Sequence, residues 1–214
     1  IPHYEKMLYD NGLLLKLYSE VICTSTLEED RMSLYARTLI KTIHWLETEM
    51  KTPEGLFYSA LDADSLNAEK HLEEGAYYTW AEDEFTEAQG GSSDEVAAFR
   101  QLLTGLTEEG RHGLTLQRFN GSITATPFLE NLLQKLAAIR SKRARPGLDD
   151  KVLTSWTALA ISGLSWASLA LKVLEDLESS EKTRNLATQA WKAVQKHAHY
   201  EGKLYSTVQK GQAK

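Results

Sequence analysis

The sequence predicts a mainly α-helical fold, in which long amphipathic helices pair as antiparallel hairpins and carry small β-hairpin inserts. Three observations support this class. Apolar residues recur at helical spacing over several long stretches, short links join these stretches, and one central stretch departs from the pattern. Paired helices of this kind are typical of a solenoid, a bundle or part of a closed ring of hairpins.

Two helices are expected before the first proline break. Leucine, valine and tyrosine recur at helical spacing over Tyr9–Cys23, which predicts an amphipathic helix. Thr26 followed by Glu29 is a capping-box pair and predicts the start of a second helix. This second helix is expected to end near Pro53, because proline cannot continue a helix.

The stretch Gly55–Trp80 interrupts the helical pattern with two aromatic-rich runs, GLFYSALDADS and EEGAYYTW, on either side of a polar loop. Aromatic residues with a period near two predict a hairpin of two strands. On such strands Asp62 and Asp64 share a face, as do Tyr78 and Trp80. Carboxylates and aromatic rings held together in this way suit a polar, ring-shaped ligand.

The second half of the chain is expected to return to helices. Pro127 stands at a first helical position, and its helix is predicted to run to about Ala144. Asp149 or Asp150 is expected to cap a nearly all-apolar, buried helix that ends near Leu174. The other expected elements are short helices at Ala81–Ala88 and Asp94–Leu103, a strand at Leu114–Phe119, a helix from Ser180 and a strand at Lys203–Val208.

Composition limits the classes of function. A chain of 214 residues with 42% hydrophobic residues can form a core, and a net charge of −6 argues against a nucleic-acid partner. Cys23 is the only cysteine, so no disulfide or cysteine zinc site is expected within the chain, and a reducing, cytoplasmic location is favoured. Neither HExxH spacing nor a glycine-rich phosphate loop occurs, so no metal or other cofactor is expected.

Hydroxyl residues interrupt the longest apolar stretch, Leu153–Leu171, so no membrane partner is expected. The chain begins with Ile1-Pro2-His3 rather than with methionine. It is therefore expected to be a piece of a larger protein.

The first of three polar clusters is PHYEKMLYDN, at the start of the chain. In one interpretation it is only a solvated loop that leads into a helix. In the other, His3 and Glu5 lie two residues apart on one side of an extended segment and act as an acid–base pair.

The second cluster comprises Asp62, Asp64 and Glu74, together with Tyr78 and Trp80. A polar hairpin tip that only makes the loop soluble would explain it. A sugar site would explain it too, because aromatic faces stack on pyranose rings and carboxylates bind hydroxyls. Glycoside hydrolysis also requires a pair of carboxylates.

The third cluster, DDKVLTSW, begins at Asp149. Acidic residues in the first turn of a helix explain Asp149 and Asp150 by capping alone. The functional interpretation adds Lys151 and Trp156, which would project from a helix start into a central cavity.

Taken in order and at their separations, PHYEKMLYDN, FYSALDADS with EEGAYYTW, and DDKVLTSW resemble the family that includes spermatogenesis-associated protein 20. Its bacterial members are usually called thioredoxin domain-containing proteins. The resemblance covers nearly the whole chain. It implies a fragment, residues 1–214, of an (α/α)6 toroid of helical hairpins similar to six-hairpin glycosidases and N-acylglucosamine 2-epimerases, without the thioredoxin-like domain of the parent. Truncation of such a ring would expose apolar helix faces, so self-association is expected.

Two functions follow as expectations from the resemblance and the clusters. One is a carbohydrate-active or carbohydrate-binding toroid domain with a glycosidase- or epimerase-like cavity; the other is a non-catalytic binding or scaffold module of a larger redox-linked protein. The expected partner is a sugar or another small polar ligand. The candidate catalytic residues are His3, Glu5, Asp62 and Asp64, and the candidate substrate-binding residues are Tyr9, Asp10, Glu74, Tyr78, Trp80, Asp150, Lys151 and Trp156.

Overall fold

The chain divides into two compact units, which are described separately. Unit 1 comprises Ile1–Glu5 and Asp62–Gly147, and unit 2 comprises Lys6–Leu61 and Leu148–Lys214. The computed structural model describes residues 3–26, 28–80, 103–105, 114–116 and 127–213.

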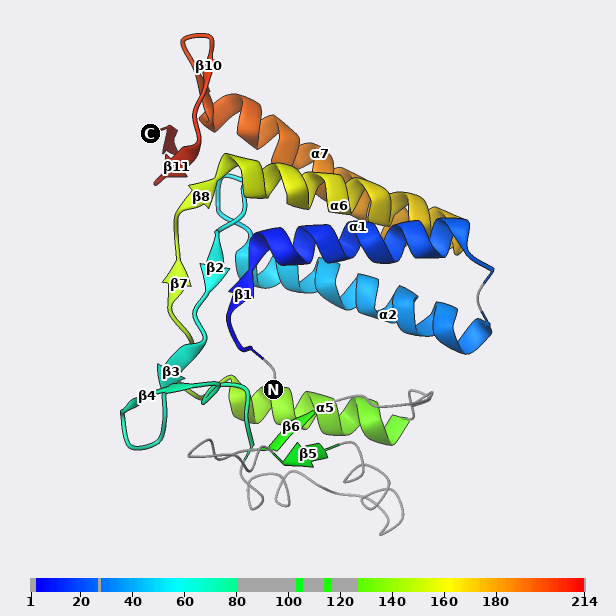
Figure 1. The fold of residues 1–214 in the computed structure, drawn as a ribbon, viewed down its shortest axis with the longest axis vertical. Coiled ribbons are helices and arrows are strands. Elements are labelled where there is room, and N and C mark those ends of the chain that lie inside the picture. The colour runs from blue at the N-terminus through cyan, green and yellow to red at the C-terminus, as the bar shows by residue number, and fades with distance from the viewer. Residues whose placement is uncertain (1–2, 27, 81–102, 106–113, 117–126, 214) are drawn as a thin grey trace. The chain divides into compact units, whose positions relative to one another are not determined.

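Unit 2 is a layer of long helices. Its helices are α1 (Leu8–Thr24), α2 (Glu29–Trp45), α6 (Thr154–Val173) and α7 (Leu177–His197), and a π-helical turn, η1 (Leu46–Met50), continues α2. Helix α1 packs against α2 on one side and α6 on the other, and α6 in turn packs against α7, as Figure 1 shows. Leucines spaced along the helices are buried between them, which is the source of the helical periodicity in the sequence.

The crossing of α1 and α6 depends on two glycines. A Cβ atom added to Gly12 would lie 2.8 Å from the backbone nitrogen of Ala160, and one added to Gly163 would overlap the carbonyl oxygen of Gly12. Hydrogen atoms at these positions therefore let the two backbones touch, and Leu15 and Leu164 are fully buried nearby in the same core.

Helix α6 is also the one helix, among the residues that the structure describes, that is long and apolar enough to cross a membrane by length and composition alone. The hydroxyl residues that interrupt this stretch therefore do not make it too polar to span a membrane. Helices buried in the cores of globular proteins are often as long and as apolar, and α6 packs between α1 and α7. The finding is weak evidence for a membrane span.

Short strands surround the helix ends of unit 2. A three-stranded antiparallel sheet has the order β1-β2-β7, with Lys6 opposite Leu61 and Ala60 opposite Asp149. The strands are β1 (Lys6–Met7), β2 (Ala60–Leu61), β7 (Leu148–Asp149), β8 (Val152–Leu153), β9 (His199–Tyr200), β10 (Lys203–Leu204), β11 (Thr207–Gln209) and β12 (Gln212–Ala213). β11 pairs with both β8 and β12, and β9 pairs with β10.

The described part of unit 1 contains two hairpins and one helix. Strand β3 (Asp64–Leu66) pairs with β4 (Leu72–Glu74), β5 (Leu103–Gly105) pairs with β6 (Leu114–Leu116), and the helix is α5 (Pro127–Arg140). Leu132 and Leu136, one turn apart on α5, are almost wholly buried.

The predicted mainly α class with small antiparallel β inserts is confirmed. The arrangement of the hairpins in a toroid stays a prediction. The helix predicted at Ala81–Ala88 lies outside the described residues, as does the one predicted at Asp94–Leu103 except for its last residue, which begins β5.

Several local predictions are wrong. The hairpin forms only at Asp64–Leu66 and Leu72–Glu74, so Asp62 lies outside its strands. The residue before α2 is Glu28, without a side-chain cap bond, rather than Thr26; α5 ends at Arg140, and the strand predicted at Lys203–Val208 is divided between β10 and β11.

Tyr77 and Tyr78 lie in a turn rather than in a strand, because Gly75 adopts φ +81° and its carbonyl oxygen accepts from the backbone N–H groups of Tyr78 and Thr79. Asp149 lies in β7, and α6 begins only after Leu153, which makes no side-chain cap bond.

The predicted helix start at Ser180 is also wrong. Helix α7 begins three residues earlier, at Leu177, because the carboxylate of Asp176 accepts from the Ser179 backbone N–H and caps the helix there.

Candidate functional site

An acidic cluster around His3 lies in unit 1. Nε2 of His3 lies 3.2 Å from Oε2 of Glu5, and Nδ1 lies 3.5 Å from Oε1 of Glu74. Each ring nitrogen therefore faces a different carboxylate, and only the doubly protonated imidazolium can donate to both. These contacts bring the first sequence cluster together with the second.

The hairpin β3–β4 adds a third carboxylate to this cluster. Asp64 lies directly opposite Glu74 in the antiparallel register. Like charges at such positions repel, and this costs stability unless a cation or a ligand stands near them. The His3 ring lies on the Glu74 side of this pair, 3.5 Å from the Glu74 carboxylate.

Asp62, the other predicted catalytic carboxylate, lies just before β3. Its Oδ1 accepts a hydrogen bond of 3.2 Å from the backbone N–H of Asp64, and its own backbone N–H donates to the carbonyl of Gly147 at 2.8 Å. One oxygen of Asp62 is therefore used to shape the turn that leads into the hairpin.

Tyr78 is held by an aromatic stack. Its ring lies parallel to that of Tyr4, with centroids 6.1 Å apart and an interplanar angle of 6°. Tyr4 is buried against Gly75, where an added Cβ would lie 2.6 Å from the Tyr4 ring. Only glycine fits at this position, both for space and for the positive φ of its backbone.

Arg143 fixes the turn that carries Tyr78. Its Nη1 lies within hydrogen-bond distance of the carbonyl oxygens of Ala76, Tyr77 and Thr79. Its guanidinium also lies 4.3 Å from the centroid of the Trp80 ring. Trp80 is almost wholly buried in this arrangement and serves as packing beneath the turn.

The phenol of Tyr78 is expected to ionise unusually late. Burial raises the pKa of Tyr78 to about 12, against the smaller opposing effect of the Arg140 charge and with a further increase from Tyr77. The unfolded chain loses this proton near pH 10 and the folded chain near pH 12, so Tyr78 should lower the stability as pH rises through that window.

Ultraviolet titration of tyrosinate absorbance checks this expectation. The difference in tyrosinate absorbance between the native protein and Tyr78→Phe should rise in a step near pH 12. A step near pH 10 in the folded protein would contradict the packing described for Tyr78.

The remaining candidate residues lie in unit 2. The rings of Tyr9 and Trp156 meet edge to face, with centroids 4.8 Å apart, so the start of α1 contacts the start of α6. Asp10 is exposed in the first turn of α1, where a carboxylate suits the helix dipole. Lys151 pairs with Asp149 at 3.2 Å, and Asp150 is exposed.

The first cluster thus meets the second in unit 1 through His3, and meets the third in unit 2 through Tyr9. The prediction that all three clusters line one hollow stays a prediction. Within the described ranges, no group of three or more His, Cys, Asp or Glu residues is arranged to hold a metal ion. A groove of about 630 Å³ lies between α6 and α7, and it is lined by none of the candidate residues.

Two residues that support the cluster were not singled out from the sequence. Tyr4 is part of PHYEKMLYDN, and its position between the candidate residues His3 and Glu5 could have indicated that it belongs to the same site. Arg143 belongs to a basic stretch that the dipole at the end of a helix explains equally well, so no sequence feature distinguished its contacts with the Ala76–Thr79 turn.

Several known proteins are similar in sequence to most of this chain. The chain is 28% identical to spermatogenesis-associated protein 20 of Homo sapiens and 30% identical to that of Mus musculus, in each case over 92% of the chain and 27% of the relative. It is 29% identical to the uncharacterized protein B0495.5 of Caenorhabditis elegans, over 85% of the chain. No protein-family model matches.

The chain spans about 27% of the length of the spermatogenesis-associated protein 20 relatives. These similarities support the resemblance that the three sequence clusters indicate.

Proposed function

We propose that this relative of spermatogenesis-associated protein 20 binds a carbohydrate, or a similar polyhydroxylated ligand, at the acidic cluster of His3, Glu5, Asp64 and Glu74. The observation that carries the proposal is the position of His3 between Glu5 and Glu74, carboxylates from distant parts of the sequence. Carboxylate oxygens accept hydrogen bonds from sugar hydroxyls. The partly exposed Tyr78 ring, fixed by its stack on Tyr4, supplies an adjacent aromatic face.

The proposal includes the toroid, in which helical hairpins from the rest of the larger protein would complete the site. Catalysis in such a site would use Asp62 or Asp64 as base or nucleophile, with Glu5 or His3 as the acid–base partner. An epimerase variant would use His3 as the base. A general base needs an unprotonated nitrogen directed at the substrate, whereas both nitrogens of His3 face carboxylates. This geometry favours binding over the epimerase variant.

The second candidate function is a non-catalytic scaffold within a larger redox-linked protein. The relatives are several times longer than this chain, so other parts of the parent would supply any chemistry. A scaffold requires no sugar binding at the acidic cluster, and this separates the two candidates by experiment.

The test is a thermal-shift screen of mono- and disaccharides on the full-length parent protein, followed by titration calorimetry. Asp64→Asn and Glu74→Gln should each weaken binding by roughly tenfold or more, since a hydrogen bond to a charged group contributes about 1.5–3 kcal/mol. Asp62→Asn and product analysis then distinguish turnover from binding alone.

Glu69→Gln is the matched control. Glu69 is an exposed carboxylate in the same hairpin and also has a histidine neighbour, His71, at 3.7 Å. Its replacement should leave the affinity unchanged. If no sugar shifts the melting temperature of the parent, or if Glu69→Gln weakens binding as much as Glu74→Gln does, the carbohydrate proposal is wrong.

A further inference from the structure

The groove between α6 and α7 is lined by large apolar side chains that the fold leaves exposed. Leu169 on α6 is 48% exposed, and Leu177 and Trp191 on α7 are 64% and 53% exposed. The partly buried Ile161 lines the groove beside them. Isolated exposed apolar residues are ordinary, but a set that lines one concave strip marks an interaction surface.

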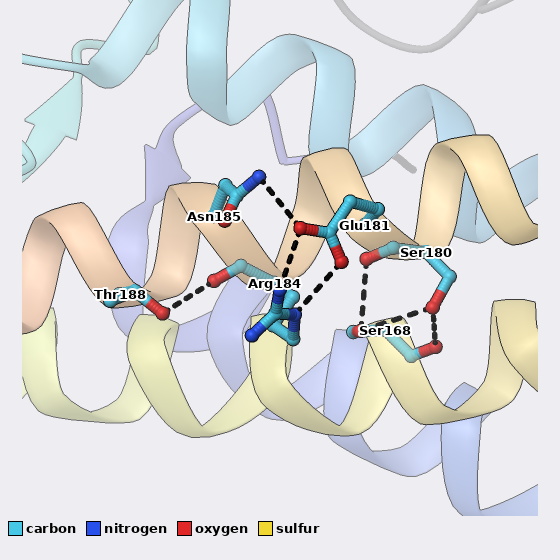
Figure 2. A network of polar contacts seen from close by, with 6 residues as sticks. All are labelled: Ser168, Ser180, Glu181, Arg184, Asn185 and Thr188. Carbon is cyan, nitrogen blue, oxygen red and sulfur yellow. Dashed lines mark hydrogen bonds and ion pairs between the residues drawn. The ribbon is translucent and has the colours of Figure 1, made fainter.

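The hydroxyl groups that line the groove already have hydrogen-bond partners. The hydroxyls of Ser168 and Ser180 bond to each other's carbonyl oxygens at 2.9 and 2.8 Å, as Figure 2 shows. The hydroxyl of Thr188 donates to the carbonyl of Arg184. These side chains are small and satisfied, so an apolar ligand could approach them without leaving a hydrogen-bonding group unpaired.

The spacing of the lining residues fits a helix. Ile161, Ser165 and Leu169 are four apart on α6, and Leu177, Arg184 and Trp191 are seven apart on α7. Such rows form the ridges between which a third helix packs. The walls are helices and offer no unpaired strand edge, so an occupant must satisfy its own backbone hydrogen bonds.

The charged residues that line the groove indicate which charge an occupant should carry. Arg184 is neutralised by Glu181, whose two carboxylate oxygens accept from Arg184 at 2.6 and 3.0 Å (Figure 2). Lys172 also lines the groove, and it has no ion-pair partner within the described part of the chain. The groove therefore carries one uncompensated positive charge in a chain whose net charge is −6.

We propose that the α6–α7 groove binds an amphipathic helix of a partner that places an apolar stripe between Leu169, Leu177 and Trp191 and a carboxylate at Lys172. The stretch from Leu177 to Trp191 corresponds to about 21 Å of helix, so about four turns of the partner fill it. This inference does not depend on the carbohydrate proposal, since the groove contains none of those residues.

The test uses fluorescence anisotropy with a labelled, stapled helical peptide of about four turns, which carries a leucine stripe and one glutamate near its end. A matched peptide has lysine in place of that glutamate. The glutamate peptide should bind the 214-residue chain roughly threefold to tenfold more tightly than the lysine peptide, and Lys172→Glu should reverse this order.

Leu177→Asp should weaken binding of the glutamate peptide by roughly tenfold or more, because an apolar anchor is lost. Leu204→Asp is the control, because Leu204 has the same exposed fraction, 64%, in the same unit but does not line the groove. An acidic residue at the first position of a helix suits its dipole, so Leu177→Asp should still fold, and circular dichroism checks this.

Two results would overturn the proposal. One is equal binding of the two peptides with equal effects of Leu177→Asp and Leu204→Asp. The other is a concentration-dependent dimer in sedimentation that Leu177→Asp abolishes while neither peptide binds, since the groove would then belong to a second copy of the chain.

Discussion

Gly163→Ala is expected to destabilise unit 2 by about 2–3 kcal/mol. The added methyl group would overlap the carbonyl oxygen of Gly12, and it would also press on Leu15. Overpacking of this kind costs about 1–3 kcal/mol or more, and a backbone oxygen cannot rotate aside as a side chain can. Alanine gains up to about 1 kcal/mol over glycine in helix propensity, so overpacking outweighs propensity here. Urea denaturation followed by circular dichroism measures the change.

Gly147→Ala serves as the control for this substitution. A Cβ on Gly147 would lie 3.6 Å from the nearest atom, Cβ of Asp62, which is an ordinary contact. Its effect should stay within about 0.5 kcal/mol, as for most substitutions that create no clash. An equal effect of Gly147→Ala and Gly163→Ala would refute the close crossing of α1 and α6.

Arg143→Ala is expected to cost unit 1 about 2–4 kcal/mol. Three backbone carbonyls would lose a charged donor, and the Trp80 ring would lose the cation above it. Arg143→Lys should recover only part of this, because an ammonium group can donate to the carbonyls but cannot stack a planar guanidinium on the Trp80 ring. Hydrogen exchange of the amides in the turn measures the loss directly.

Lys142→Ala is the neighbouring control, since Lys142 is exposed and the hydrogen bond from its backbone N–H to the Ile139 carbonyl survives the substitution. The Tyr78 ring should also lose its fixed position in Arg143→Ala, and sugar binding at the acidic cluster should weaken with it. Unchanged exchange in Arg143→Ala would mean that Tyr4 and Gly75 alone hold the turn.

The exposed groove between α6 and α7 bears on the self-association expected of the chain. Its apolar rim is the kind of surface through which two copies of the chain would associate. The Lys172 charge favours a partner helix with a carboxylate, and the peptide experiment decides between this partner and a second copy.

The local part of the fold was predictable from the sequence. The helix predicted at Tyr9–Cys23 is Leu8–Thr24, because the leucines that repeat at helical spacing form the face that packs in the core. The start of α6 was not predictable in the same way. Asp149 has the features of a cap, yet pairing with Ala60 places it in a strand.

The sequence by itself determined that long helices alternate with small β inserts and that polar clusters stand beside their ends. Only the tertiary structure decided that His3 lies between Glu5 and Glu74, that Arg143 holds the turn of Tyr78, and that Lys172 lines a groove. The reason is physical. Helical periodicity depends on neighbours three or four residues apart, whereas these contacts depend on where distant backbone segments direct their side chains.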